Sequence, residues 1–255
     1  MQATNYFMQG ILNLTRGIDL TAPAAFYLAL YRSDPTATGT AGTEISYTGY
    51  ARQAITFSAT NSTASGYVSN SAQITFPQIP RNVSQTVTHV GVLDAETGGN
   101  MYLYAELADP VPLGDAVKIF FAAAVLKWTF SGIFTSDYRL KFLNFFKNGT
   151  SISGFTPYLA LYNSSTSEKN SGSYARQEIA MTLNTSQNKI SNVENIDFPI
   201  ATASWGTVAQ AAIVDAATSG TRYALFTLTS SFSAPTGSQV RVNSGAITIT
   251  MQDPA

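Results

Sequence analysis

The sequence contains no cysteine and a single histidine, His89, among its 255 residues. The missing cysteine excludes disulfides and metal sites built on thiolates. Only 11% of the residues are charged, and the formal net charge at pH 7 is −1. A chain with so little charge has no global field that draws it to nucleic acid or to an anionic membrane, so we predict neither as a partner.

The sequence also has no apolar run long enough to cross a membrane. Its most apolar stretch, residues 116–134, is interrupted by Lys118 and Lys127, whereas a membrane span needs about 20 consecutive apolar residues. The N-terminal segment has no basic region followed by an apolar run and a small-residue cleavage site, which are the marks of a signal peptide. We therefore expect a chain that is made in the cytoplasm and does not insert into a membrane.

What the sequence does contain is a repeat. The heptapeptide YLALYRS at Tyr27–Ser33 returns as YLALYNS at Tyr158–Ser164. Further motifs recur in the same order, including GYARQAI with SYARQEI and VGVLDAETGG with AAIVDAATSG. The chain is therefore a tandem duplication, and 255 residues are enough for two units of ordinary domain size. We predict two domains, residues 1–132 and residues 133–255.

Each predicted domain opens with a short amphipathic helix. Apolar residues at helical spacing lead up to Gly17 in the first copy and to Gly149 in the second, and a glycine after the last turn is a helix stop. Caps are expected before the first apolar residue of each helix, at Thr4 or Asn5 in the first copy and at Ser136 or Asp137 in the second.

After each helix the apolar period changes from about 3.6 to two, which indicates strands. Short strands separated by Gly, Pro, Asn and Ser turns favour a mainly β fold of two tandem antiparallel β-sandwiches, immunoglobulin-like or jelly-roll-like. The predicted strands of the first copy are 26–31, 50–58, 72–76, 87–94, 101–107 and 117–129. Those of the second copy are 158–162, 175–183, 193–198, 208–215, 223–228 and 240–251.

One turn is specified by its residues. The stretches LDAETGG and VDAATSG place Asp94 and Asp215 at the end of an apolar strand, with Gly98 and Gly220 shortly afterwards. An aspartate at the first turn position accepts hydrogen bonds from backbone amides, and a glycine tolerates a positive φ. We predict a hairpin loop of four or five residues in which these four residues are structural, in preference to a ligand or metal site at the aspartates.

Aromatic and arginine side chains mark a candidate interface. Arg52 and Arg176 each follow a tyrosine by two residues and therefore share a strand face with it. An internal ion pair or cation–π stack is the favoured interpretation, and a contact with a neighbouring subunit is the alternative. Tyrosines also line the face of the YLALY strands opposite Phe26, Leu28 and Leu30. The candidate interface residues are Tyr27, Tyr31, Arg52, Tyr158, Tyr162 and Arg176.

Catalytic motifs are missing. No H-E-x-x-H, G-x-S-x-G or phosphate-binding loop is present, and Gln210 replaces His89 in the second copy. The acidic residues are thinly spread, and we expect them not to recur between the copies except at the hairpin. Three cations of the second helix, Arg139, Lys141 and Lys147, are interpreted as its solvated face in preference to a phosphate contact. We predict no enzyme, no catalytic residue, no cofactor and no metal.

The motifs themselves resemble a known family. The stretches YLALY, GYARQAITF, ITFP and THVGVLDAETGG are similar to small bacteriophage virion proteins commonly labelled phage tail fiber proteins, and the second copy, with FPIATASWGTVAQAAIVDAATSG, resembles them as closely. The chain differs from that family pattern in carrying two fused copies. It also has no heptads, collagen-like triplets or β-helix repeats that would build a fibre shaft. A compact module docked on a virion fits it better than a literal fibre.

The resemblance implies a non-enzymatic structural protein of a phage tail, tail fibre or neck, located in the virion and made in the cytoplasm of a bacterial host. Three copies of a duplicated chain would present six similar domains, so we expect a homotrimer with pseudo-six-fold symmetry that contacts other virion proteins. Two alternatives stay open. A capsid decoration or cement protein would need a flat apolar patch, and an adhesin module for a host-surface glycan would need an exposed aromatic residue flanked by polar side chains.

Overall fold

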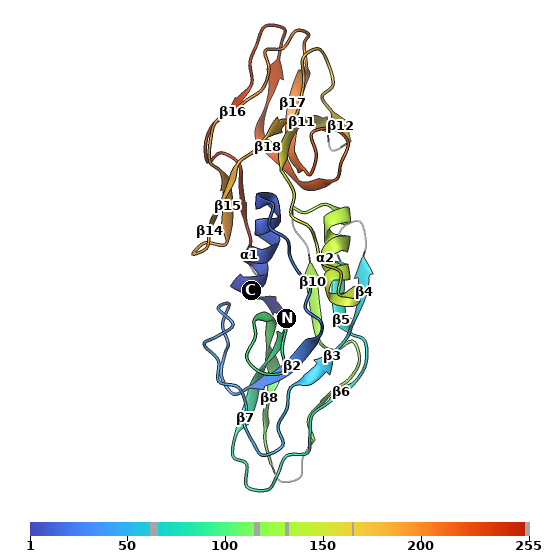
Figure 1. The fold of residues 1–255 in the computed structure, drawn as a ribbon, viewed down its shortest axis with the longest axis vertical. Helices are drawn as coiled ribbons and strands as arrows, with labels where there is room; N and C mark the ends of the chain where they lie inside the picture. The colour runs from blue at the N-terminus through green and yellow to red at the C-terminus, as the bar shows by residue number, and fades with distance from the viewer. Residues whose placement is uncertain (62–65, 115–117, 131–132, 165, 253–255) are drawn as a thin grey trace.

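The computed structural model describes residues 1–61, 66–114, 118–130, 133–164 and 166–252. The molecule is elongated, with helical segments near its middle and a strand-rich region toward each end (Figure 1). The first repeat forms one end and the second repeat forms the other. The predicted domain boundary after residue 132 lies outside the described residues, and so does Val117 at the start of one predicted strand.

Most elements of the first repeat recur in the same order in the second. The first contains β1 (Gln2–Ala3), α1 (Asn5–Asn13), the 3-10 turn η1 (Leu14–Arg16), β2 (Phe26–Tyr31), β3 (Gln53–Ile55), β4 (Phe57–Asn61), β5 (Gly66–Asn70), β6 (Ile74–Thr75), β7 (Thr86–Leu93), β8 (Met101–Pro112), β9 (Phe120–Phe121) and β10 (Lys127–Phe130). The second contains α2 (Ser136–Asn148), β11 (Tyr158–Ser164), β12 (Ser167–Glu168), β13 (Gln177–Glu178), β14 (Met181–Asn184), β15 (Lys189–Asn192), β16 (Ile196–Asp197), β17 (Gly206–Val214), β18 (Arg222–Ala234), β19 (Arg241–Val242) and β20 (Thr248–Thr250).

The largest sheet of each repeat is antiparallel and has five strands. Its order is β1-β8-β7-β2-β3 in the first repeat and β12-β11-β17-β18 in the second, where β13 also pairs with β11. Smaller sheets accompany it: β10-β5-β4 and β6-β9 in the first repeat, β14-β15-β20 and β16-β19 in the second. The strand β2, which lies between β7 and β3, follows its alternating sequence: Phe26, Leu28 and Leu30 enter the main core, while Tyr31 packs in a separate cluster.

The helices begin and end for local reasons. Thr4 caps α1, as expected, by accepting a hydrogen bond from the Phe7 amide over 3.4 Å. The cap of α2 is Thr135 rather than either residue expected from the sequence, and its hydroxyl donates to the carbonyl of Arg222. Both helical segments stop at a glycine in the left-handed region, at φ 72° for Gly17 and 61° for Gly149.

The predicted mainly β class is confirmed, but the β-sandwich is not. No second broad sheet faces the large sheet of either repeat among the described residues. Helices and small sheets take that place instead: the ring of Phe7 in α1 packs on Tyr102 of β8, with centroids 5.5 Å apart. Helical side chains therefore fill the core that a sandwich would build from two sheets.

The core is continuous across the two repeats. One cluster of buried apolar residues includes Phe7 and Leu28 of the first repeat together with Phe142, Phe146 and Ile213 of the second. Each helix contacts strands of both repeats: α1 packs on β8 and on β14 and β15, while α2 packs on β18 and on β4 and β5. The small sheet of each repeat is therefore covered by the helix of the other.

The sequence does not predict β5 and β15, because both contain buried polar residues. Asn70 at the end of β5 accepts a hydrogen bond from the Leu126 amide and donates to the carbonyls of Ala72 and Ala122. Asn192 at the end of β15 makes the corresponding three bonds, with Ile247, Glu194 and Asn243. A buried amide is tolerated only where such partners exist, and most of these partners lie far away in the sequence.

Candidate functional site

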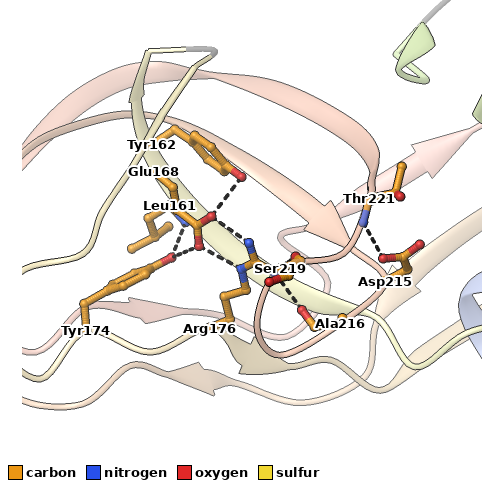
Figure 2. Close-up of polar contacts among 9 residues, drawn as sticks. All are labelled: Leu161, Tyr162, Glu168, Tyr174, Arg176, Asp215, Ala216, Ser219 and Thr221. Atoms are coloured by element: carbon orange, nitrogen blue, oxygen red, sulfur yellow. Dashed lines mark hydrogen bonds and ion pairs between the residues drawn. The ribbon is translucent and has the colours of Figure 1, made fainter. Parts of the chain in front are cut away.

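The second repeat contains a cluster of polar residues around Arg176, drawn in Figure 2. The guanidinium of Arg176 binds both carboxylate oxygens of Glu168, with Nε–Oε1 and Nη2–Oε2 distances of 2.7 Å. The hydroxyls of Tyr162 and Tyr174 donate to the same carboxylate over 3.2 and 3.3 Å. Tyr174 also accepts a hydrogen bond from the Leu161 amide in β11, over 2.9 Å. We call Glu168, Tyr174 and Arg176 the Glu–Tyr–Arg cluster of the second repeat.

The cluster fixes the hairpin loop between β17 and β18. Nη1 of Arg176 donates to the carbonyls of Ala216 and Ser219 in that loop, over 2.8 and 2.5 Å (Figure 2). All three nitrogens of the guanidinium are thus hydrogen bonded within the chain. A side chain whose donors are used in this way holds the loop in place and has little capacity left for an anionic ligand.

The first repeat contains the same cluster, formed by Glu44, Tyr50 and Arg52. Arg52 binds the carboxylate of Glu44 over 2.8 and 2.9 Å, and Tyr50 donates to that carboxylate over 2.9 Å. Nη1 of Arg52 reaches the carbonyls of Ala95 and Gly98 in the β7–β8 loop, both over 2.7 Å. The internal ion pair favoured from the sequence is therefore present in both repeats, and it extends to the hairpin loop.

Burial and hydrogen bonding perturb the ionisation of this cluster. Burial alone would raise the pKa of the Glu168 carboxyl, but the hydrogen bonds and charge of Arg176 outweigh it and hold that pKa below its usual value. The same hydrogen bond to Glu168 raises the pKa of Arg176. Burial raises the pKa of Tyr174 and, in the first repeat, that of Tyr50. The carboxylate and the guanidinium therefore stay charged, and the tyrosines stay neutral, near pH 7.

The hairpin aspartates accept backbone hydrogen bonds across their loops. Asp94 Oδ1 receives the amide of Asn100 over 2.7 Å, and Asp215 Oδ1 receives that of Thr221 over 2.5 Å. Gly98 and Gly220 both have positive φ, at 62° and 74°. By structure Gly98 corresponds to Ser219, since each offers its carbonyl to the arginine, and Gly220 corresponds to Gly99.

The candidate interface tyrosines do not form one exposed face. Tyr31 and Tyr162 are each only 5% exposed. Tyr31 packs with Leu93, Met101 and Tyr104, and burial raises its pKa to about 12. Tyr27 and Tyr158 are half-buried. Tyr31 and Tyr162 are too buried to contact a neighbouring subunit. A subunit contact through Tyr27 and Tyr158 stays a prediction.

Two interpretations of charged residues were wrong. Acidic residues were expected to recur only at the hairpin, yet Glu44 and Glu168 hold the same place in the two repeats. The signal was present as a glutamate six residues before the tyrosine and eight before the arginine, hidden in a loop whose length differs between the copies. Arg139 was expected on a solvated helix face, but it is 4% exposed, and its Nη1 donates to the carbonyl of Phe134 over 2.9 Å.

The other basic residues singled out in the sequence lie at the surface or contact neighbouring side chains. Lys147 is exposed, and Lys141 lies 3.9 Å from Asp215 and over the ring of Tyr138. His89 Nδ1 is 2.9 Å from the hydroxyl of Thr88. Within the described residues no three His, Cys, Asp or Glu side chains are grouped to hold a metal ion. The described part of the chain also has no helix long and apolar enough to span a membrane.

A cavity of about 370 Å³ lies in the second repeat. Its walls include Phe226, Leu228 and Phe232 of β18, facing Val242 and Thr248. The two repeats differ at one residue of this wall. Val242 of β19 pairs with Ile196, whereas Phe121 of β9 pairs with Ile74 at the corresponding place in the first repeat. Valine is smaller than phenylalanine, so a phenylalanine in place of Val242 would reduce this cavity.

The comparisons with known proteins agree with the duplication. The family model described as Podophage GP4 fiber I protein gp80 matches residues 2–129 and, a second time, residues 135–250. The two matches follow the two repeats and together span most of the chain. No curated protein gives a significant match.

Proposed function

Because the chain belongs to the family of the podophage GP4 fiber I protein gp80, we propose that it is a non-enzymatic structural component of a phage tail, of the tail-fibre type, which assembles through protein surfaces. The observation that carries the proposal is the match of the fiber family over both repeats. The polar cluster supports it, because its arginines and carboxylates are occupied in holding hairpin loops. Other virion proteins are the proposed partners.

We propose a homotrimer as the oligomeric state, but not the pseudo-six-fold ring expected from the sequence. Neighbouring units of a six-fold ring are related by a rotation of one sixth of a turn. The reciprocal contacts between the two repeats, such as the paired backbone bonds of Leu20 and Ile152, are those of a two-fold relationship. Three copies would then place six repeats in two layers of three. A mass measurement that finds a monomer at micromolar concentration would contradict the trimer.

A host-surface glycan is a second candidate partner, supported by the cavity of the second repeat. The exposed ring of Phe232 stands beside Thr227, Thr229 and Thr248 at this cavity, and aromatic rings flanked by hydroxyls suit uncharged sugars. The variant Val242→Phe introduces the residue of the first repeat. We expect it to abolish glycan binding on an array of host-surface sugars while the fold is retained. No binding by the unmodified protein would contradict this role.

The location in the virion is tested by imaging purified particles labelled with an antibody against this chain. Label at one vertex or along the tail is the expected result. Label over the whole head would overturn the tail assignment in favour of a capsid decoration protein. Cryo-electron microscopy of the same particles would give the copy number and the symmetry.

A further inference from the structure

Equivalent residues of the two repeats bind each other at the centre of the molecule. Leu20 and Ile152 each lie three residues after the glycine that ends a helix. The Leu20 amide donates to the Ile152 carbonyl over 2.8 Å, and the Ile152 amide donates to the Leu20 carbonyl over 2.9 Å. A contact in which the same residue faces itself is the signature of a two-fold axis between identical surfaces.

The neighbouring side chains repeat this reciprocity. Asp19 Oδ1 of the first repeat accepts the amide of Gly154 over 2.8 Å, and the hydroxyl of Ser151 in the second repeat accepts the amide of Ala22 over 2.9 Å. Asp19 and Ser151 are equivalent positions, as are Ala22 and Gly154. The two-fold relationship therefore survives although the side chains have diverged.

The helices also make reciprocal contacts, because each one packs against the core of the other repeat. Phe146 of α2 is 4% exposed and packs on Phe57 of β4 and Trp128 of β10, with ring centroids 5.4 and 5.6 Å apart. In the other direction, Gln9 of α1 donates to the Thr185 carbonyl in the β14–β15 loop over 3.1 Å. Tyr223 of β18, which is fully buried, donates to the Ile11 carbonyl of α1 over 2.9 Å.

Neither repeat has a complete core by itself. Removing the second repeat would expose Phe57 and Trp128 of the small sheet and Phe7 of α1, all of which now pack on α2. Burial of apolar rings is a main source of folding stability, so exposing several of them together would remove a large share of the stability of an ordinary domain.

We propose that the opening helix and the small sheet of each repeat form a self-complementary docking surface whose partner is a second copy of the same module. In this chain the sister repeat occupies that surface, so the protein is a covalently linked dimer of modules that folds as one cooperative unit. The covalent link turns dimerisation into an intramolecular step and makes it independent of protein concentration. The proposal rests on the fold alone and not on the virion location.

The two tryptophans provide a direct test in the full-length chain. Trp128 lies in the first repeat and Trp205 in the second, and both are buried. The single-tryptophan variants Trp205→Phe and Trp128→Phe are unfolded in denaturant and followed by fluorescence. One unfolding unit predicts that the further substitution Phe142→Ala lowers the midpoint by the same amount with either reporter. Phe142 of α2 packs on Phe130 of β10 in the first repeat, with ring centroids 4.8 Å apart. Where this variant does not fold, Phe142→Leu serves in its place.

Other outcomes overturn the proposal. A shift seen only with Trp205 would mean that α2 stabilises its own repeat alone. A shift seen only with Trp128 would mean that the contacts are exchanged but the repeats unfold separately. Either result removes the cooperative unit.

Because the chain has no cysteine, the double variant Leu20→Cys/Ile152→Cys tests whether the contact forms within one chain. Paired antiparallel residues lie within disulfide range. Oxidation of dilute protein is expected to give an internally crosslinked monomer, and each single variant serves as the control. A covalent dimer as the main product of the double variant would show that the surface is filled by another chain and would overturn the proposal.

Discussion

Arg176 and Glu168 form a two-point ion pair in which both N–O distances are 2.7 Å, and the arginine side chain is only 11% exposed. The same geometry joins Arg52 to Glu44 in the first repeat. Each arginine also donates hydrogen bonds to two carbonyls of a hairpin loop. Substitutions in this cluster therefore test how the structure is stabilised.

The substitution Arg176→Lys keeps the charge but removes the planar fork. We expect it to lower the free energy of unfolding by about 1–3 kcal/mol, because the loop carbonyls and the carboxylate lose their shared donor. Denaturant titration measures the change. Arg241→Lys is the matched control, because Arg241 forms the same two-point pair with Asp197 at an exposed position, where little effect is expected. Equal effects of the two variants would contradict the structural role of the cluster.

The same pair predicts a pH dependence. The pKa of Glu168 is lower in the folded protein than its usual 4.5, so the folded state binds this proton less readily than the unfolded state. The stabilisation is therefore complete above the unfolded pKa and is lost as pH falls through the lowered folded pKa. We expect Glu168→Gln to be less stable than the unmodified protein near pH 7 and to lose less stability on acidification. Unfolding titrations between about pH 7 and about pH 3 measure both curves, and parallel curves would contradict the assignment.

Gly220 is required by space as well as by backbone angle. Its φ is 74°, and a Cβ there would lie 2.5 Å from Asp215 Oδ1. Gly237 has a φ of 85°, but a Cβ added there would meet no heavy atom within 4 Å. Gly237→Ala should cost about 1–2 kcal/mol for the left-handed conformation alone, and Gly220→Ala should cost more. Thermal melting compares the two, and the opposite order would show that the Asp215 loop adapts freely.

Tyr162 is expected to act on stability and not on association. It is 5% exposed and donates to Glu168, so Tyr162→Ser leaves a cavity and removes a hydrogen bond. We expect a loss of about 3 kcal/mol or more in the free energy of unfolding. Tyr158→Ser, at a half-buried position of the same strand, is the comparison and should cost less. Weakened self-association of Tyr162→Ser at an unchanged melting temperature would instead place Tyr162 in a subunit interface.

Several features could be predicted from the sequence because they depend on neighbours along the chain. The helix stops at Gly17 and Gly149 and the aspartate-led loops follow from local residue preferences. The YLALY strands follow from an alternation that any sheet would use. The duplication is visible as sequence identity, and the family match to both repeats confirms it.

Other features required the tertiary structure. The burial of Tyr31 and Arg139 depends on which elements cover them, and the sequence alternation only assigns Tyr31 to a face. The carbonyls that Arg52 and Asn70 bind include ones that lie far along the chain, so the sequence alone does not show that these polar side chains are satisfied.

The sequence by itself determined that there are two copies of one module, each with a helix followed by strands. Only the tertiary structure decided that the helix of each copy covers the small sheet of the other. The physical reason is that the copies are alike: the apolar face of α2 would fit its own small sheet or that of its sister, and the pattern of apolar residues is the same in both arrangements. The choice between the two arrangements depends on how the segments after the two helices pair with each other, at Leu20 and Ile152.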